Sequence, residues 1–350
     1  MNIVIFAGGA GTRLWPISRQ RSPKQFEKLK DDTSTLQMAV HRVKSFGLDH
    51  LYISTNEQYA ELVEEQVPEI DKNHIFLEPA RRDLAAAVLL TLLRLKKQGV
   101  RGTIAVLWSD HFMDHEDQFL SALKKGEELL KKSANHFVFL GEKPRFANHN
   151  LGWIEIGKPI SDDVYEFRSW KYRPEFDVCK DMLASGNWLW NPGYFLFDID
   201  FVLRMYEEHQ PELFERLSAL MLDEKLLQEG YKDLPSMSFD NAIIEKADPH
   251  EAVVLPVDMG WSDPGTLYAL KEALTTSEEE NYTKGNVLPF NTRDSFVFNE
   301  ESGKLVTTIG LDGMLVINTK DAVLVCPKDR VPEIKELLKQ IEFDGLERYL

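Results

Sequence analysis

Short apolar runs rich in β-branched residues alternate with longer amphipathic segments through the first half of the chain. Such runs are typical of buried strands, and apolar residues three and four positions apart are typical of helices that cover a sheet. The predicted strands are Asn2–Ala7, Leu51–Ser54, Ile75–Leu77, Ile104–Trp108 and Phe137–Leu140. The predicted helices are Leu36–Phe46, Tyr59–Gln66, Leu84–Lys97 and Phe119–Lys132. This alternation predicts an α/β fold with a doubly wound, Rossmann-like and mainly parallel sheet.

The pattern loosens from about Gly152 into segments rich in Trp and Gly, in which two helices are predicted, Phe201–Glu208 and Glu212–Gln228. Beyond an acidic stretch, the predicted elements are four short strands and a helix: Ser295–Phe298, Lys304–Ile309, Met314–Asn318, Ala322–Cys326 and Val331–Ile341. This predicts a small β-rich C-terminal domain. We therefore divide the chain into a large N-terminal α/β domain, residues 1–280, and a C-terminal β domain with a terminal helix, residues 281–350.

Composition and charge narrow the classes of partner. With 350 residues, of which 43% are hydrophobic, the chain can bury a sizeable core. The formal net charge of -16 argues against a nucleic acid or an anionic membrane as the main partner. Cys179 and Cys326 lack a CxxC spacing, so buried free thiols in a reducing, cytoplasmic setting are expected. The opening residues are typical of a core strand rather than a signal peptide, and no apolar run is long enough to span a bilayer.

A glycine-rich segment, FAGGAGTRLWPISRQRSPKQF, follows the first predicted strand, where doubly wound sheets bind ligands. Gly8, Gly9 and Gly11 allow backbone N–H groups to approach phosphate oxygens. Arg13 and Lys24 add two cations, which suit a triphosphate. The segment is neither a Walker loop, because it lacks Gly-Lys-Ser/Thr, nor a dinucleotide fingerprint, because a leucine replaces the third glycine. A structural turn with solvated cations is the competing interpretation.

Carboxylates follow two other predicted strands. Asp110 comes after Ile104–Trp108 and is a candidate ligand for Mg2+, although a residue at such a position often caps a helix or forms a turn. Glu78 begins the segment EPARRDLAAAV, which follows a strand and opens a helix. On the sequence alone, Asp83 in that segment is best interpreted as a helix-capping residue.

The glycine-rich segment resembles the signature of the sugar nucleotidylyltransferases, and its RLWP and PKQF resemble the mannose-1-phosphate guanylyltransferase branch in particular. Further stretches resemble that family in the same order, and the likeness runs from residue 1 to about residue 340; they are EPARRD, LGWIEIG, NWLWNPGYF, MSFDNAIIEKA, GWSDPG and LDGMLVINTKDAVLVCPKDR. The resemblance implies that GTP and mannose 1-phosphate give GDP-mannose and pyrophosphate with Mg2+. It also implies a left-handed β-helix-like C-terminal domain and a homodimer.

The resemblance implies a role for each matching residue. Arg13 would hold the triphosphate in the transition state, Lys24 would neutralise the α-phosphate and the incoming sugar phosphate, and Asp110 and Asp263 would bind the metal. The implied nucleotide-binding residues are Ala7, Gly8, Gly9, Gly11, Thr12, Glu78, Pro79, Arg82 and Asp83. The implied sugar-phosphate-binding residues are Gly152, Glu155, Arg173 and Asn191, with Asp240 and Glu245 lining the same lobe.

The chain departs from the family pattern at three places. Asp83 and Leu84 stand where Asn and Thr are usual, which bears on the identity of the base, and WNPG replaces WNSG. Where the family has Glu-Lys-Pro, this chain has Tyr172 and Arg173 before the proline, which puts Arg173 in the role of the phosphate-binding lysine. Lys171 is the competing candidate for that role.

Two alternatives to GDP-mannose synthesis stay open. One keeps the chemistry and changes the nucleoside triphosphate or the sugar, for example to another hexose or a heptose 1-phosphate. The other is a non-catalytic regulatory subunit that binds a nucleotide sugar. The joint presence of Arg13, Lys24, Asp110 and Asp263 counts against a regulatory subunit, because a sensor does not need the metal pair.

Overall fold

The computed structural model describes residues 1–9, 14–19, 21–30 and 32–350. The chain forms two compact units. Unit 1 consists of Met1–Gly8, Ala39–Ser109 and Met113–Trp261, and unit 2 consists of Gly9–Met38, Asp110–Phe112 and Ser262–Leu350. In unit 2, part of the glycine-rich segment and a short stretch after a central strand pack with the C-terminal residues. The division into domains at residue 280 stays a prediction.

Unit 1 is built on a 10-stranded sheet with the order β10-β8-β9-β12-β7-β11-β6-β1-β4-β5. The strands are β1 (Asn2–Phe6), β4 (Leu51–Asn56), β5 (Ile75–Glu78), β6 (Thr103–Trp108), β7 (Phe137–Glu142), β8 (Gly152–Ser161), β9 (Val164–Tyr172), β10 (Trp188–Asn191), β11 (Phe195–Asp198) and β12 (Ala252–Val257). β1 pairs in parallel with β4 and β6, and β4 pairs in parallel with β5. The predicted α/β fold with a parallel-rich sheet is therefore confirmed.

The other half of the sheet is mixed. β11 lies between β6 and β7 and is antiparallel to both. β8 pairs antiparallel with β9 and β10, and β12 joins this group to β7. The sequence pattern did not predict these antiparallel strands. Exposed residues interrupt the apolar run in β8 and β9, whereas β11 is buried but only four residues long.

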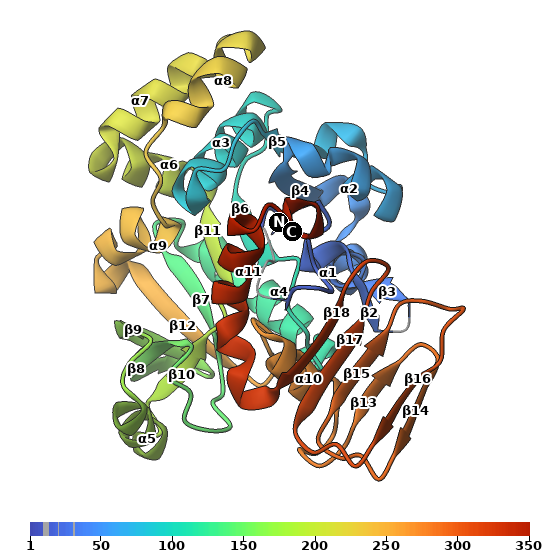
Figure 1. Ribbon diagram of the computed structural model, residues 1–350. Coiled ribbons are helices and arrows are strands. Elements are labelled where there is room, and N and C mark those ends of the chain that lie inside the picture. The colour runs from blue at the N-terminus through green and yellow to red at the C-terminus, as the bar shows by residue number, and fades with distance from the viewer. Residues whose placement is uncertain (10–13, 20, 31) are drawn as a thin grey trace. The chain divides into compact units, whose positions relative to one another are not determined.

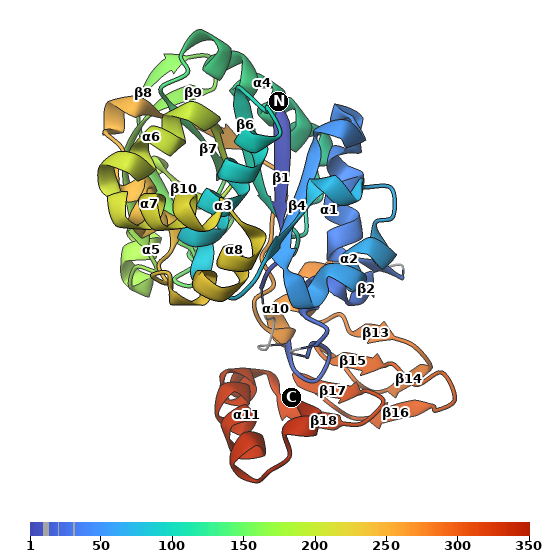
Figure 2. The ribbon, with the colours of Figure 1, turned by 90° about the horizontal axis from the view of Figure 1, so that it is seen from above.

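Helices cover both faces of this sheet. They are α2 (Ala60–Gln66), α3 (Asp83–Lys97), α4 (Glu116–Lys132), α5 (Phe176–Ser185), α6 (Ile199–His209), α7 (Pro211–Leu220), α8 (Glu224–Gly230) and α9 (Phe239–Ala242). Figures 1 and 2 show α3, α6 and α7 together on one side, where the core includes Phe137 and Phe139. α4 packs on the opposite face, where a Cβ at Gly126 would lie 2.9 Å from Leu196 Cδ2. Successive side chains along a strand point to opposite faces of the sheet, so the strands contribute to a separate core under the helices on each face.

The predicted helix Glu212–Gln228 is wrong as a single element, because the chain breaks between α7 and α8. Asp223 lies in the break and accepts hydrogen bonds from the backbone N–H groups of Lys225 and Leu226, at 2.8 and 3.3 Å. A side-chain acceptor at this position satisfies the first N–H groups of a new helix. The helical spacing of apolar residues continues across the break and so concealed it.

Unit 2 contains the C-terminal β domain. Its strands and helices are β13 (Tyr282–Lys284), β14 (Val287–Phe290), β15 (Phe296–Asn299), β16 (Val306–Ile309), β17 (Met314–Asn318), β18 (Val323–Pro327), α10 (Leu267–Leu274) and α11 (Ile334–Phe343), and two short strands, β2 (Lys28–Lys30) and β3 (Thr33–Ser34), precede α1 (Thr35–Val43). β13, β15 and β17 stack in parallel, as do β14 and β16. The amide of Asn318 donates to Asn299 Oδ1 at 2.7 Å between stacked strands. This arrangement confirms the predicted β-helix-like domain.

The N-terminal stretch of unit 2 shares a core with its C-terminal domain. Leu14, Trp15 and Ile17 are buried in one cluster with Phe296 and Leu315. The hydroxyl of Tyr282 donates to the carbonyl of Leu29 at 2.6 Å. Burying apolar side chains from both stretches stabilises unit 2 as a single body.

Among the described residues, no helix has both the length and the hydropathy needed to cross a membrane.

Candidate active site

Unit 2 brings together three of the predicted site residues. The Lys24 Nζ lies 2.7 Å from Asp110 Oδ2 and 3.2 Å from Asp263 Oδ1. The Lys24 side chain is 11% exposed, whereas the two carboxylates are 30% and 35% exposed. One cation therefore lies between two carboxylates that still face solvent, and incoming ligands can reach them.

Local backbone structure fixes the places of these residues. Lys24 begins a 3-10 helix, η2 (Lys24–Phe26), directly after Pro23. Phe112 and Ser262 form an antiparallel bridge, with N–H to carbonyl distances of 3.0 and 3.1 Å in the two directions. Asp110 lies two residues before Phe112 and Asp263 directly follows Ser262, so the bridge sets the two carboxylates on neighbouring segments.

The charges of the trio reinforce one another. Burial alone would lower the pKa of the Lys24 ammonium, but Asp110 and Asp263 outweigh burial and raise that pKa. Burial alone would raise the pKa of Asp110, but Lys24 and His111 outweigh it and lower that pKa to about 2. Lys24 and Asp110 are therefore both charged at neutral pH.

The donor set at this position fits a magnesium ion. Two carboxylates lie on either side of one cation, and Mg2+ is usually held by one or two carboxylates together with substrate phosphates and waters. Within the described part of the chain, no group of three or more His, Cys, Asp or Glu residues is arranged to hold a metal. The pair would therefore need phosphate oxygens or water to complete a coordination shell.

The glycine-rich segment is held at the end of β1. The N–H of Ala7 donates to Ser54 O at 2.8 Å, and the Thr55 hydroxyl donates to Ala7 O at 2.9 Å. In unit 2, the Gln25 side chain donates to Gly9 O at 3.0 Å, which ties that glycine to the Lys24 helix. Gly11, Thr12 and Arg13 lie outside the described residues, so their assigned roles stay predictions.

Glu78 is a buried carboxyl beside the first glycine in unit 1. A Cβ at Gly8 would lie 3.5 Å from Glu78 Oε1, and the Tyr231 hydroxyl donates to Glu78 Oε2 at 3.0 Å. Burial raises the pKa of Glu78 to about 7, although the Tyr231 hydrogen bond and nearby Arg94 oppose that effect. Tyr231 follows a helix 153 residues farther along the chain and carries no motif of its own, so the sequence pattern does not indicate it.

The other residues of the EPARRD segment were predicted either to bind the nucleotide or to begin a helix. Pro79 is half-buried at the end of β5. The Arg82 Nε is buried and has no hydrogen-bond partner among the described residues. Asp83 adopts a φ of 60° at the start of α3 and accepts a hydrogen bond from Leu84 N at 2.7 Å. Asp83 is therefore the first residue of α3 and not its cap, because the N-cap position is Arg82, and no side-chain hydrogen bond within the described part of the chain caps this helix.

Two sugar-site candidates meet on the antiparallel strands of unit 1. Gly152 on β8 pairs with Asn191 on β10 and with Tyr172 on β9. A Cβ at Gly152 would lie 3.7 Å from Asn191 Nδ2 and 3.9 Å from Tyr172 Cδ2. The missing side chain leaves room between these two neighbours, and the Asn191 Oδ1 is fixed by the N–H of Gly193 at 2.9 Å.

Arg173 and Lys171 differ in how the backbone at the end of β9 places them. The φ of Arg173 is 45°, which breaks the strand alternation after Tyr172. Its guanidinium carbon lies 5.1 Å from the centre of the Tyr172 ring, and its Nε donates to Asn150 O at 3.3 Å. Lys171 precedes this break and pairs with Trp153, so alternation directs it to the face opposite Gly152.

Glu155 is not brought to the same group. It lies three positions after Gly152 on β8, and alternation directs its side chain to the other face. Its carboxylate accepts a hydrogen bond from the Ser169 hydroxyl at 2.8 Å. Asp240 is half-buried in α9, and burial together with Glu245 raises its pKa.

Comparison with protein families matches residues 2–280 to the nucleotidyl transferase family and residues 285–341 to the MannoseP isomerase/GMP-like beta-helix domain. Among curated proteins, mannose-1-phosphate guanylyltransferase 2 of Escherichia coli O157:H7 is 31% identical over 365 residues, covering 99% of this chain and 74% of that protein. The mannose-1-phosphate guanylyltransferase of Klebsiella pneumoniae is 31% identical over 361 residues, covering 99% of this chain and 75% of that protein.

Two solved structures are similar to this chain over most of its length. A structure described as mannose-1-phosphate geranyltransferase from Thermus thermophilus is similar with a TM-score of 0.88 and 27% identity, covering 97% of this chain and 99% of that chain. A structure described as mannose-6-phosphate isomerase from Helicobacter pylori has a TM-score of 0.60 and 22% identity, covering 75% of this chain and 99% of that chain. The second likeness concerns the fold alone.

Proposed function

This chain belongs to the nucleotidyl transferase family and is a nucleotidyltransferase, and from this premise we propose that it makes GDP-mannose and pyrophosphate from GTP and mannose 1-phosphate. An oxygen of the sugar phosphate attacks the α-phosphorus of GTP, the bond from that phosphorus to the bridging oxygen breaks, and pyrophosphate leaves. Curated relatives named for this activity match nearly the whole chain. The observation that carries the proposal is the position of Lys24 between Asp110 and Asp263.

Lys24 has the charge and the position to serve the phosphate groups. Its ammonium stays protonated at neutral pH, because the two carboxylates raise its pKa. Positioned charge of this kind stabilises the charge that develops on a transferring phosphoryl group. Arg13, eleven residues earlier, is proposed to hold the triphosphate. Mg2+, when bound by Asp110 and Asp263, supplies Lewis-acid polarisation of the α-phosphate.

The base and the sugar phosphate are assigned to unit 1. Arg82, whose Nε is buried and unpaired among the described residues, is proposed to contact the nucleotide, with Glu78 beside Gly8. Arg173 is proposed to anchor the sugar phosphate, while Gly152 and Asn191 face the hexose. A guanidinium that lies over the Tyr172 ring, next to the space at Gly152, supports this choice over Lys171.

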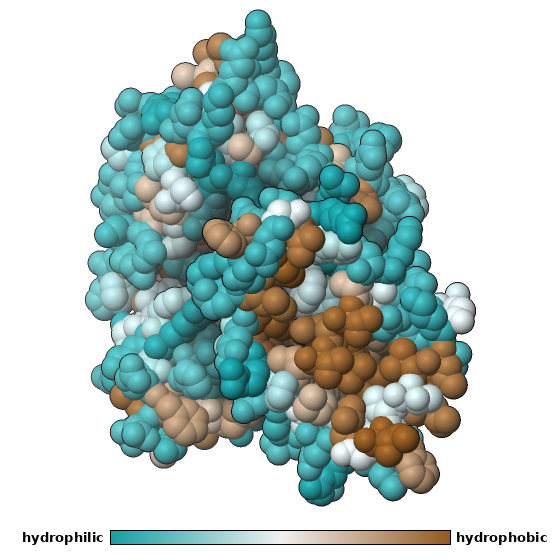
Figure 3. Space-filling model, viewed as in Figure 1, coloured by the Kyte–Doolittle hydropathy of each residue, from teal (hydrophilic) through white to brown (hydrophobic). Residues whose placement is uncertain are grey.

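A homodimer in the cytoplasm is the proposed form of the enzyme. Six exposed apolar side chains on the C-terminal domain support an interface between copies; they are Leu288, Phe290, Leu305, Ile309, Val323 and Val325. Figure 3 shows apolar surface gathered over these strands of unit 2. Cys179 and Cys326 are buried free thiols, which suit a reducing compartment.

The test is a pyrophosphate-release assay with a substrate matrix. Purified protein is incubated with Mg2+, each of the common nucleoside triphosphates and a panel of hexose and heptose 1-phosphates. We expect release with GTP and mannose 1-phosphate, none when either substrate is left out, and loss of turnover in EDTA. Faster turnover with another pair would keep the reaction class and replace the substrates. No release from any pair would favour a regulatory subunit.

A further inference from the structure

We propose that Trp15 and Arg19 are positioning residues, which fasten the Lys24 segment (residues 14–19 and 21–26) to residues 346–350 and so hold Lys24 in its catalytic place. All of these residues belong to unit 2. The inference rests on the proposed function, because it assigns Lys24 a part in nucleotidyl transfer. It adds two residues that themselves touch no reacting group.

The main-chain carbonyl of Tyr349 accepts hydrogen bonds from both side chains. The Trp15 Nε1 donates to Tyr349 O at 2.7 Å, and Arg19 Nη1 donates to the same oxygen. The Arg19 guanidinium carbon also lies 5.4 Å from the centre of the Trp15 ring. Because one acceptor fixes two side chains that also contact each other, displacement of the Tyr349 carbonyl would release both of them together.

The other side of the Arg19 guanidinium is fixed by the C-terminal β domain. Its Nη2 donates to Thr319 Oγ1 at 3.2 Å and to Asp321 Oδ1 at 2.6 Å. The Arg19 side chain is 16% exposed and the Asp321 side chain is 46% exposed, so the guanidinium is largely covered while its carboxylate partner faces solvent. Charge-assisted hydrogen bonds of a shielded guanidinium are among the stronger ones in proteins.

Short backbone contacts connect this anchor to Lys24. The N–H of Arg19 donates to Ser22 O at 2.8 Å, and the N–H of Ser22 donates to Arg19 O at 3.2 Å. The Ser22 hydroxyl then donates to Glu27 Oε1 at 2.5 Å, just beyond η2. Lys24 lies between these two contacts, so the turn at Arg19 and Ser22 determines where η2 begins. A shift of Arg19 would therefore reach the Lys24 ammonium.

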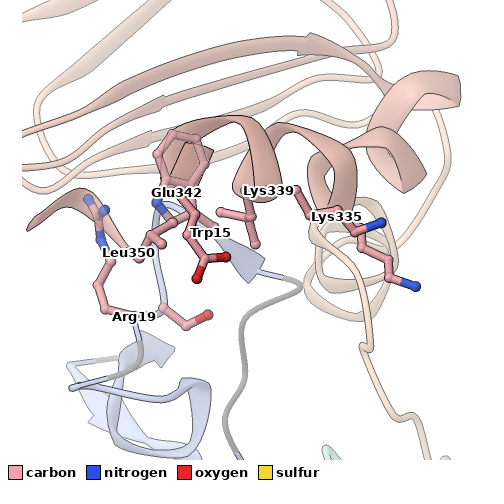
Figure 4. A pocket seen from close by; sticks show the side chains of 8 residues that line it. Trp15, Arg19, Lys335, Lys339, Glu342 and Leu350 are labelled. Atoms are coloured by element: carbon pink, nitrogen blue, oxygen red, sulfur yellow. The ribbon is translucent and has the colours of Figure 1, made fainter. Parts of the chain in front are cut away.

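Helix α11 supports the anchor from the side. Trp15, Ser18 and Arg19 line a cavity together with residues of α11 and the end of the chain: Lys335, Leu338, Lys339, Glu342 and Leu350. Figure 4 shows Trp15 and Arg19 beside this helix. Trp15 is 6% exposed, so its ring packs in the core while its N–H is used for the Tyr349 contact. Phenylalanine at this position would lose the N–H and also part of the buried ring, whereas Arg19→Ala removes anchor contacts and leaves the Trp15 ring in place.

The experiment uses substitutions that remove the anchor and keep the fold. Trp15→Phe deletes the donor, Arg19→Ala deletes the guanidinium, and Arg19→Lys keeps the charge. Arg348→Lys is the matched control, because Arg348 contacts the Tyr349 side chain rather than its carbonyl. Turnover and both Michaelis constants are measured with GTP, mannose 1-phosphate and Mg2+, and hydrogen exchange is followed at the amides of residues 22–27.

We expect Trp15→Phe and Arg19→Ala each to lower kcat by roughly tenfold, the size of a lost hydrogen bond of about 1.4 kcal/mol. The Michaelis constants should change much less than kcat, amide exchange at 22–27 should accelerate, and Arg19→Lys should recover part of the loss. Wild-type kcat and wild-type exchange in both variants would overturn the proposal. If either variant fails to fold, Asp321→Asn, which removes a surface partner of Arg19, takes its place with the same expectation.

The two proposals fail in different ways. If the wild-type protein forms no nucleotide sugar, the proposed function fails, and amide exchange still decides whether Trp15 and Arg19 hold the Lys24 segment. If the wild-type protein is active and the variants match it in rate and exchange, only the positioning role fails.

Discussion

The Lys24 ammonium lies 2.7 Å from the Asp110 carboxylate and so occupies the charge position at which a magnesium ion is proposed to bind. Lys24 also contacts Asp263, the second proposed metal ligand. If both carboxylates bind the metal as proposed, the ammonium and the metal would compete for them in the ligand-free protein. A bound triphosphate would offer Lys24 other anionic partners and would leave the two carboxylates to the metal.

This competition predicts that Lys24→Ala binds a divalent metal more tightly than the wild-type protein when no nucleotide is present. Removing the ammonium leaves the two carboxylates without a protein cation between them. We expect an increase of roughly tenfold in affinity for Mn2+, or about 1.4 kcal/mol, measured by titration of the paramagnetic ion. The same titration of Asp263→Asn should show weaker binding. Equal affinity in wild type and Lys24→Ala would show that the metal does not bind to Asp110 and Asp263.

Turnover should move in the opposite direction to metal affinity. We expect Lys24→Ala to lower kcat by about two orders of magnitude or more, because a preorganised charge partner of the transition state is lost. Arg13→Ala should have a comparable effect. Lys28→Ala is a suitable control, since Lys28 is exposed four residues beyond Lys24. Near-wild-type rates in both Lys24→Ala and Arg13→Ala, with folding verified by circular dichroism, would show that the segment is only structural.

The sugar-phosphate anchor can be assigned by comparing two neighbouring cations. Arg173→Ala should raise the apparent Michaelis constant for mannose 1-phosphate by roughly 10- to 150-fold, the equivalent of a charge-assisted hydrogen bond of about 1.5–3 kcal/mol. The constant for GTP should change little. Lys171→Ala, on the opposite face of β9, should have a small effect on both constants. The reverse ranking would move the anchor to Lys171.

Glu78 should make stability depend on pH. Burial raises its pKa from 4.5 to about 7 in the folded protein, so its contribution to stability is fully present below about pH 4.5 and is lost as pH rises through about 7. Glu78→Gln should therefore gain stability relative to wild type between about pH 5 and about pH 8, by at most about 3 kcal/mol. The measurement is urea unfolding across that range.

Glu27 provides a comparison for this measurement. Burial also raises its pKa to about 7, but it lies in unit 2, so Glu27→Gln should remove a separate part of the pH dependence. If Glu78→Gln keeps the wild-type pH dependence, Glu78 is ionised in the folded protein throughout this range.

The sequence pattern predicts the parallel half of the sheet well, because strands buried on both faces are continuous apolar runs. β1 and β6 illustrate this. Exposed residues interrupt the apolar runs of β8 and β9, so the pattern does not indicate these two strands. Helical spacing continues through Asp223, so the pattern does not indicate the break between α7 and α8. Motif resemblance selected Lys24, Asp110 and Asp263, which the structure places together.

Contacts between distant residues could not be predicted in this way. Tyr231 reaches Glu78 across 153 positions, and Trp15 reaches Tyr349 across 334 positions. Neither tyrosine belongs to a periodic pattern or a motif that indicates its partner. Only the folded backbone brings each of these pairs together.

Unit 2 is formed by segments that lie far apart in the chain, and this has a consequence for synthesis on the ribosome. Its first stretch, Gly9–Met38, packs with Ser262–Leu350, so the earliest-made part of this unit finds its partners only when the last part has emerged. At about 5–20 residues per second, the interval is roughly 15 to 60 s. During that time the apolar side chains of Leu14, Trp15 and Ile17 lack the core they share in the finished protein. A nascent chain stalled before Ser262 should therefore bind chaperones through this N-terminal stretch.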